Sequence, residues 1–170
     1  MLKCFASSLA MRSQSSKNSR GIATWLVDGS PAPPDEVSHY KQTGRPGHRA
    51  PHVWLQDGKS ILDLFGRGYV LVCFSAADGE GFSKAASRRG VPLEVVELIG
   101  EEAARLLYGA NYVLVRPDGH VAWRGDTLPE DAGLVIDVVR GAATNAATSV
   151  AKEVLAAHNQ ATLAARENAP

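Results

Sequence analysis

An uninterrupted apolar run, YVLVCFSA at residues 69–76, leads directly into a small glycine-rich loop and then into a helical pattern. A run without polar alternation is typical of a strand that is covered on both faces. The FSKAASRRG segment at 82–90 predicts a short helix, with two arginines in its last turn and a glycine at its end. This strand and helix predict a layered fold in which helices pack on a sheet.

The segments around this run complete a regular order of strands and helices. HVWL at 52–55 predicts a strand, ILDLFGRG at 61–68 a short helical step, and LEVVELI at 93–99 a second buried strand. EEAARLLYG at 101–109 and PEDAGLVIDVVRGA at 129–142 predict helices, the second with Pro129 near its first position. NYVLVRPDGHVAWRG at 111–125 predicts a hairpin. The fold class is therefore α/β, with a mixed central sheet flanked by helices.

The composition divides the chain into four predicted parts. Residues 1–27 form a leader, 28–51 a Pro/Gly-rich extended arm outside the core, 52–142 the folded domain, and 143–170 an Ala-rich helical tail with a weak apolar stripe. The leader is rich in serine and arginine and has no acidic residue before Asp28. That composition is typical of a mitochondrial transit peptide. We expect a cytoplasmic location, with a mitochondrial one as the alternative.

The net charge and the cysteines exclude several classes of function. The 18 basic and 18 acidic residues give a formal net charge of zero, so no strong field attracts nucleic acid or an anionic membrane. No apolar run approaches the length of a transmembrane helix. The two cysteines, Cys4 and Cys73, match no metal or redox spacing, and Cys73 is interpreted as a small buried residue inside a strand. We expect neither nucleic acid nor membrane as a partner.

The element order resembles the thioredoxin fold, and local motifs resemble a more specific family. VLVCFSAADGEGFSKAA at 70–86 is similar to the thioredoxin strand, active-site loop and helix, with residues 79–82 where the Cys-x-x-Cys motif belongs and Asn111 where the cis-proline belongs. PGHRAPH at 46–52, LDLFG at 62–66 and VRPDGHVAWR at 115–124 resemble the C-terminal thioredoxin-like domain of FAD-dependent aromatic-ring hydroxylases, over about residues 24–142.

That resemblance implies a parent family that uses FAD and NAD(P)H, whereas the residues of this chain predict no catalytic site of their own. A thiol reaction needs a reactive thiolate, and the loop offers Ser75, Asp78, Glu80 and Ser83 instead. No Gly-x-Gly-x-x-Gly follows a strand to receive a dinucleotide. We therefore expect no catalytic residue, bound cofactor or metal in this chain. The segment before the loop also resembles peroxiredoxins, but that alternative lacks its cysteine.

Contact with a partner is the function that these patterns favour. The expected role is a non-catalytic accessory domain that packs against a flavin domain or forms oligomer contacts. One alternative is a monooxygenase component that is active only with a partner, and another is a self-associating domain whose tail forms the contact. The candidate interface residues are His48, Arg49, His52, Trp54 and Trp123. His48 and His52 are four residues apart, but Pro51 between them argues against a helical metal site.

For Arg49 and His52 we expect hydrogen bonds to backbone where the arm joins the sheet. Alternation along the second hairpin strand predicts Val121 and Trp123 on one face, with His120, Ala122 and Arg124 on the other. An exposed apolar patch is expected along residues 46–55, bare without its partner.

Overall fold

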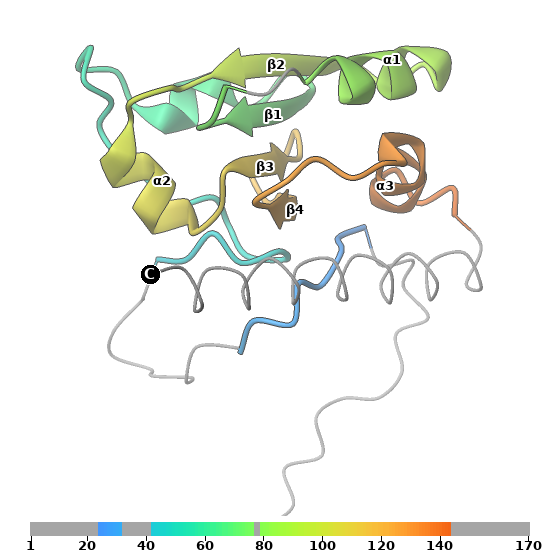
Figure 1. Cartoon of the computed structure of the whole chain (residues 1–170), viewed down its shortest axis with the longest axis horizontal. Helices are drawn as coiled ribbons and strands as arrows, with labels where there is room; N and C mark the ends of the chain where they lie inside the picture. The colour runs from blue at the N-terminus through green and yellow to red at the C-terminus, as the bar shows by residue number, and fades with distance from the viewer. Residues whose placement is uncertain (1–23, 32–41, 77–78, 144–170) are drawn as a thin grey trace, which may run out of the picture.

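The computed structural model describes residues 24–31, 42–76 and 79–143, and its elements follow the predicted order (Figure 1). The elements are η1 (Ile61–Leu64), β1 (Tyr69–Cys73), α1 (Glu80–Arg88), β2 (Leu93–Glu97), α2 (Glu102–Tyr108), β3 (Tyr112–Val115), β4 (Val121–Gly125) and α3 (Ala132–Val139). Within these ranges no helix has the length and apolarity that crossing a bilayer requires. The predicted leader and tail lie almost entirely outside the described residues, so nothing tests those two assignments.

The four strands form one mixed sheet in the order β2-β1-β3-β4. β1 and β2 are parallel and are joined through α1, whereas β3 is antiparallel to both β1 and β4. A parallel pair followed by an antiparallel hairpin and a final helix is the thioredoxin arrangement. The prediction of an α/β thioredoxin-like fold with a mixed sheet is confirmed.

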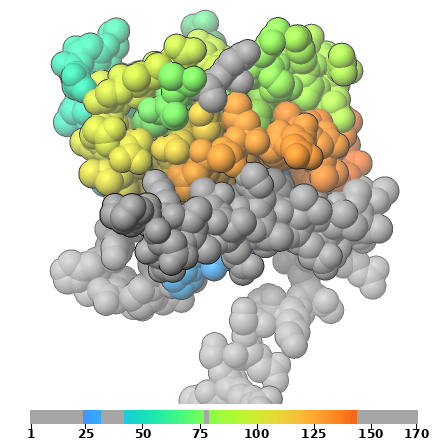
Figure 2. Space-filling view, in the orientation of Figure 1, coloured from blue at the N-terminus to red at the C-terminus, as the bar shows by residue number. Residues whose placement is uncertain are grey.

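Two apolar cores lie on opposite faces of the sheet. On the first, which we call the α1/α3 face, Leu71, Leu114 and Trp123 pack with the apolar sides of α1 and α3. These two helices lie beside each other in Figure 2 as the green and orange surfaces. On the second, the α2 face, Val72 and Val113 pack with α2, η1 and the segment around Ala50. The apolar run at 69–76 forms a strand covered on both faces because its alternate side chains enter different cores.

The described part of the arm is integral to the fold, which corrects the prediction that 28–51 lies outside the core. Residues 47–50 run along the outer side of β4. Gly47 and Ala50 donate backbone hydrogen bonds to Val121 and Gly119, both at 2.8 Å, and the Val121 amide donates to the carbonyl of His48 at 2.9 Å. Ala50 is buried in the α2-face core. Composition suggested a linker because prolines and glycines dominate, but the backbone between them still pairs with a strand.

The strand predicted at 52–55 is wrong. The structure has only an isolated bridge there, between Trp54 and Ser60. The Leu55 amide donates to Lys59 across the Asp57-Gly58 turn, so the segment closes a tight loop instead of joining the sheet. Apolar residues in HVWL resembled a strand, yet Leu55 turns inward as an anchor while Trp54 stays outside.

β2 is an edge strand, which corrects the expectation of a second buried strand. Leu93, Val95 and Val96 are half-buried, and Glu94 and Glu97 are exposed. Its apolar residues are divided between the two faces, because Leu93 and Val95 pack against the α1/α3 core and Val96 packs against the α2 core. The short helix in the predicted step at 61–68 is η1, a turn of 3-10 helix capped by Ser60.

A β-bulge in the hairpin overturns the predicted alternation along β4. Leu114 pairs with Trp123 and Val115 pairs with Val121, so Ala122 is an extra residue in β4. As a result Val121 faces the α2 core, whereas Trp123 and Ala122 belong to the α1/α3 core. Helix α3 also starts later than expected, because Asp131 is its N-cap and accepts a 3.0 Å hydrogen bond from Leu134.

Candidate interface and the loop after β1

The junction between β1 and α1 is where thioredoxins carry their reactive cysteines, and here it serves packing. Gly79 precedes α1, and a Cβ atom at this position would lie 2.8 Å from Val95 Cγ1 and 3.0 Å from Leu71 Cδ2. Phe82 is 1% exposed, and its ring centroid lies 5.4 Å from that of Trp123. Residues 79–82 correspond to the Cys-x-x-Cys motif. The first of them, Gly79, has no room for a side chain, and the last, Phe82, is a buried core residue.

Cys73 is the last residue of β1 and is fully buried in the α1/α3 core. Its interpretation as a small buried residue inside a strand is confirmed. A thiol in this position is out of reach of a substrate in solution, whereas reactive cysteines are partly exposed.

Asn111, at the position of the thioredoxin cis-proline, ties the start of β3 to the end of β4. Its amide donates to Asp126 Oδ1 at 3.3 Å, and its side-chain Nδ2 donates to the Asp126 carbonyl at 3.2 Å. Both contacts are local and polar. They hold the open end of the hairpin together.

Of the predicted interface residues, His48 and Arg49 lie next to β4. His48 Nε2 is 3.2 Å from Arg45 Nη1. The same Arg45 side chain donates a hydrogen bond through Nε to the carbonyl of Ser30. Arg49 forms a backbone bridge with His120, and its side chain is exposed. The arm therefore joins the sheet at Arg49 through its main chain.

His52 and Trp54 come together in the loop before η1. Their rings meet edge to face with centroids 4.9 Å apart, while the His52 amide donates to Gln42 Oε1 at 2.7 Å. Trp54 is 66% exposed, an unusual position for so large an apolar side chain. The expected patch along 46–55 narrows to this residue, because Ala50, Pro51 and Leu55 are buried.

Trp123 lies inside the domain, apart from the other four candidates. It is 2% exposed, and its Nε1 has no hydrogen-bond acceptor within the described ranges. Its ring packs in the α1/α3 core. The surface candidates are then His48, Arg49, His52 and Trp54.

An ion pair that sequence reasoning missed anchors the N-terminal segment. Arg124 Nε lies 2.6 Å from Asp28 Oδ2, and Arg124 Nη1 donates to the carbonyl of Tyr108 at 2.7 Å. Burial favours the protonated form of Asp28, but the hydrogen bond from Ser30 and the Arg124 guanidinium outweigh it and hold the pKa of this carboxyl below its usual value. The partners are 96 residues apart in sequence, so no local spacing could indicate them.

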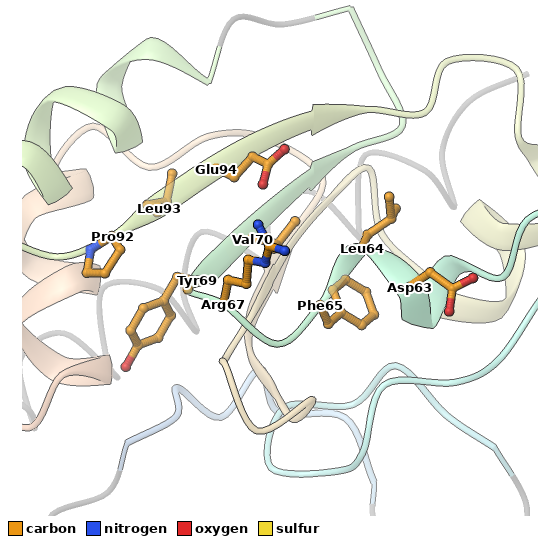
Figure 3. Close-up of a pocket in the computed structure, with 10 residues that line it drawn as sticks. Asp63, Leu64, Phe65, Arg67, Tyr69, Val70, Pro92, Leu93 and Glu94 are labelled. Carbon is orange, nitrogen blue, oxygen red and sulfur yellow. The ribbon is translucent and has the colours of Figure 1, made fainter.

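A groove of about 580 Å³ lies at the other end of β1 from the α1 junction (Figure 3). Tyr69, Leu93 and Glu94 line it from the two parallel strands, and Phe65 and Arg67 line it from the segment that leads into β1. The wall is mixed, with aromatic and aliphatic surface beside acidic and basic groups. No group of three or more metal-ligating side chains occurs here or elsewhere in the described residues.

Comparison with known families identifies relatives of this domain. The family model for the C-terminal domain of aromatic-ring hydroxylases matches residues 43–143. A FAD-dependent monooxygenase of Emericella nidulans is 42% identical over 123 residues, which is 68% of this chain and 20% of that protein. The tetracenomycin B2 monooxygenase-dioxygenase of Streptomyces olivaceus is 42% identical over 113 residues, again 20% of its length.

Solved structures agree with the family match. The rebeccamycin biosynthetic enzyme RebC with bound 7-carboxy-K252c has a TM-score of 0.63 and 47% identity, over 71% of this chain and 23% of RebC. A ternary complex of aklavinone-11 hydroxylase with FAD and aklavinone has a TM-score of 0.57 and 31% identity, over 72% of this chain. The fold, with Gly79 and Phe82 packed in the core at the position of Cys-x-x-Cys, defines a thioredoxin-like domain without its cysteines. The chain belongs to the family of aromatic-ring hydroxylase C-terminal domains, and it spans about a fifth of the curated relatives it matches.

Proposed function

We propose that this chain is a non-catalytic accessory domain that packs against the flavin domain of an aromatic hydroxylase. The observation that carries the proposal is the loop after β1, where Gly79 has no space for a side chain and Phe82 is part of the core. A position that supplies the nucleophile in thioredoxins here supplies packing. Contact with another polypeptide is then the role left to the domain surface.

The relatives support the choice of partner. They are FAD-dependent monooxygenases and hydroxylases, and this chain aligns with about a fifth of each. In our proposal FAD and NAD(P)H belong to a partner polypeptide, and none of the described residues of this chain holds either one. The carboxylates with a lowered pKa, Asp28, Asp57, Asp118 and Asp137, all take part in ion pairs. Their pKa shifts therefore have a structural cause.

Trp54 is the residue we propose as the centre of the contact. A tryptophan with two thirds of its surface exposed offers a large apolar area and an N–H donor, the combination enriched in protein interfaces. His52 fixes one edge of the ring, so the side chain loses little freedom when a partner covers it. His48 and Arg49 supply polar groups nearby along the same stretch of chain.

The test mixes the full chain with the flavin domain of a relative, or with one encoded beside its gene, and measures affinity by calorimetry. We expect a stable complex that Trp54→Ala weakens by about tenfold or more, which is the loss typical of a central interface residue. Leu106→Ala is the matched control, because Leu106 is an equally exposed apolar side chain on α2. Absence of any complex, or equal loss in both variants, would refute the assignment of Trp54 as the contact.

Cofactor measurements distinguish the accessory role from the alternative, a monooxygenase component. We expect the purified full chain to be colourless and to consume no NADPH, both alone and in mixtures without a flavin domain. A chain that retains flavin absorbance after gel filtration would overturn the accessory role. Oligomer contacts are tested in the same preparation by sedimentation, where a concentration-dependent mass in the absence of the flavin domain would favour self-association.

A further inference from the structure

The two edge strands of the sheet, β4 and β2, differ in what lies beside them. The outer side of β4 is occupied by the chain itself, through the backbone hydrogen bonds of residues 47–50 and through Leu26, whose amide donates to Ala122 at 2.8 Å. β2, at the opposite edge, pairs only with β1 in the described part of the chain. Figure 1 shows β2 as the outermost strand on its side of the sheet.

The direction of the backbone groups in β2 follows from the bonds at the two ends of the ladder. Tyr69 donates to the carbonyl of Pro92 at 2.9 Å, and Leu98 donates to the carbonyl of Cys73 at 2.8 Å. In a parallel ladder, alternate residues direct both backbone groups to the same neighbour. Glu94 and Val96 are therefore bonded to β1, and the amides and carbonyls of Leu93, Val95 and Glu97 point away from the sheet.

The side chains of β2 define what could pair with these groups. Leu93 and Val95 are half-buried on the α1/α3 face. The Glu94 side chain, on the α2 face, is exposed and makes no hydrogen bond or ion pair with the side chains or backbone of the described residues. The groove adjoining it is lined by Glu94, Asp63 and Arg67 together with Phe65, so its charged lining is acidic by one group.

We propose that β2 is a docking edge for an extended polypeptide segment in which apolar and basic residues alternate. The added strand bonds to the outward amides and carbonyls of Leu93, Val95 and Glu97. Its apolar side chains lie beside Leu93 and Val95, and its basic side chains lie beside Glu94. In the groove, Phe65 contacts the aliphatic stem of a lysine or arginine while Glu94 and Asp63 receive its charge. This proposal stands independently of the partner proposed for Trp54.

A heptapeptide of alternating lysine and valine, capped at both ends, is the probe. Its binding to the full chain is followed by amide hydrogen exchange and by fluorescence anisotropy. We expect new protection at the amides of Leu93, Val95 and Glu97, with no change at those of Glu94 and Val96, which are already bonded. Protection elsewhere, or none at these three amides at high peptide concentration, would overturn the proposal.

A charge-reversal variant provides the second test of the proposal. Glu94→Lys should weaken the lysine-valine peptide and strengthen a glutamate-valine peptide, each by about fivefold, because cross-strand charge pairs change sign. Glu130→Lys, in the exposed loop before α3, is the control and should change neither affinity. Equal binding of both peptides to wild type and Glu94→Lys would contradict the basic character of the segment.

Val95→Pro tests the backbone pairing itself. It removes an outward amide but none of the bonds to β1, and edge strands accept proline at such positions. With protection of β1 and β3 amides showing a folded sheet, the variant should bind the lysine-valine peptide at least about tenfold more weakly. Unchanged affinity in the folded variant would rule out strand addition. Protection of the three amides that rises with protein concentration alone would identify a second copy as the occupant and would also overturn the proposal.

Discussion

One ion pair attaches the segment at 24–31 to the rest of the domain. Asp28 is only 8% exposed at its side chain, and its charge is balanced by Arg124 on β4. Taking away one partner of such a pair leaves the other charge without compensation in a poorly solvated place. The pair therefore links the N-terminal segment to the hairpin more firmly than the composition of that segment suggests.

For Arg124→Ala we expect a loss of about 3 kcal/mol in the free energy of unfolding, since an almost buried carboxylate then lacks its counter-charge. Urea denaturation measures the loss. Arg116→Ala is the comparison, because its partner Asp118 is half exposed and the change should cost about 1 kcal/mol or less. Equal losses would show that burial does not set the strength of the Asp28 pair.

The same pair predicts a pH dependence. The folded-state pKa of Asp28 is below its usual 3.8, so the folded chain binds fewer protons and gains stability as pH rises. This contribution is complete above the unfolded pKa and is lost as pH falls through the folded one. The stability difference between wild type and Asp28→Asn should shrink as pH falls below about 4. Urea denaturation of both proteins at neutral and at acidic pH measures this difference, and a difference that stays constant as pH falls would contradict the role of the pair.

Two glycines at the start of α1 make opposite predictions. Gly79→Ala places a Cβ atom 2.8 Å from Val95 Cγ1 and should destabilise the fold by about 1–3 kcal/mol through overpacking. Gly81 has open space around it and lies within the helix, so Gly81→Ala should stabilise by about 0.5–1 kcal/mol. Thermal unfolding of both variants decides. A stabilised Gly79→Ala would mean that the start of α1 has room for a side chain and would contradict the packing described here.

At the scale of elements, the order of strands and helices could be predicted because each is marked by its own residues. The apolar run at 69–76 and the glycines that end α1 and α2 are local features, and the Pro-Asp-Gly turn specifies the hairpin. The faces of β4 could not be predicted, because the bulge at Ala122 arises from pairing with β3 and has no local pattern. Likewise, nothing in the composition of the arm shows that its backbone seals the edge of β4.

Leu26 tests whether the segment at 24–31 is an element of the fold. It is 1% exposed, in the α1/α3 core, and its amide bonds to Ala122. Leu26→Ala should cost about 2–4 kcal/mol in the free energy of unfolding, as expected for an aliphatic side chain removed from a core. Its neighbour Val27 is partly exposed, and Val27→Ala should cost well under half as much. Chemical denaturation at neutral pH compares the two, and similar costs would place Leu26 outside the core.

For the molecule as a whole, the candidate site could be predicted only in kind. The absence of Cys-x-x-Cys in the loop indicated contact in place of catalysis, and the family resemblance supplied the partner class. Which of the candidate residues are available for the proposed contact depends on tertiary packing, which buries Trp123 and exposes Trp54. Two tryptophans that look equivalent in sequence therefore have different environments.

Iodide should quench the fluorescence of Trp54 strongly and that of Trp123 hardly at all. Trp54→Phe should remove most of the quenchable emission apart from that of Trp25.

The unequal edges of the sheet also limit how these molecules can aggregate. A sheet that is open on both sides can recruit neighbours without end, which is the geometry of a fibre. Here residues 47–50 already occupy the place beside β4, so within the described ranges the strand with an open edge is β2. When two copies pair through β2, each covers the open edge of the other, so that contact closes at a pair instead of extending into a fibre.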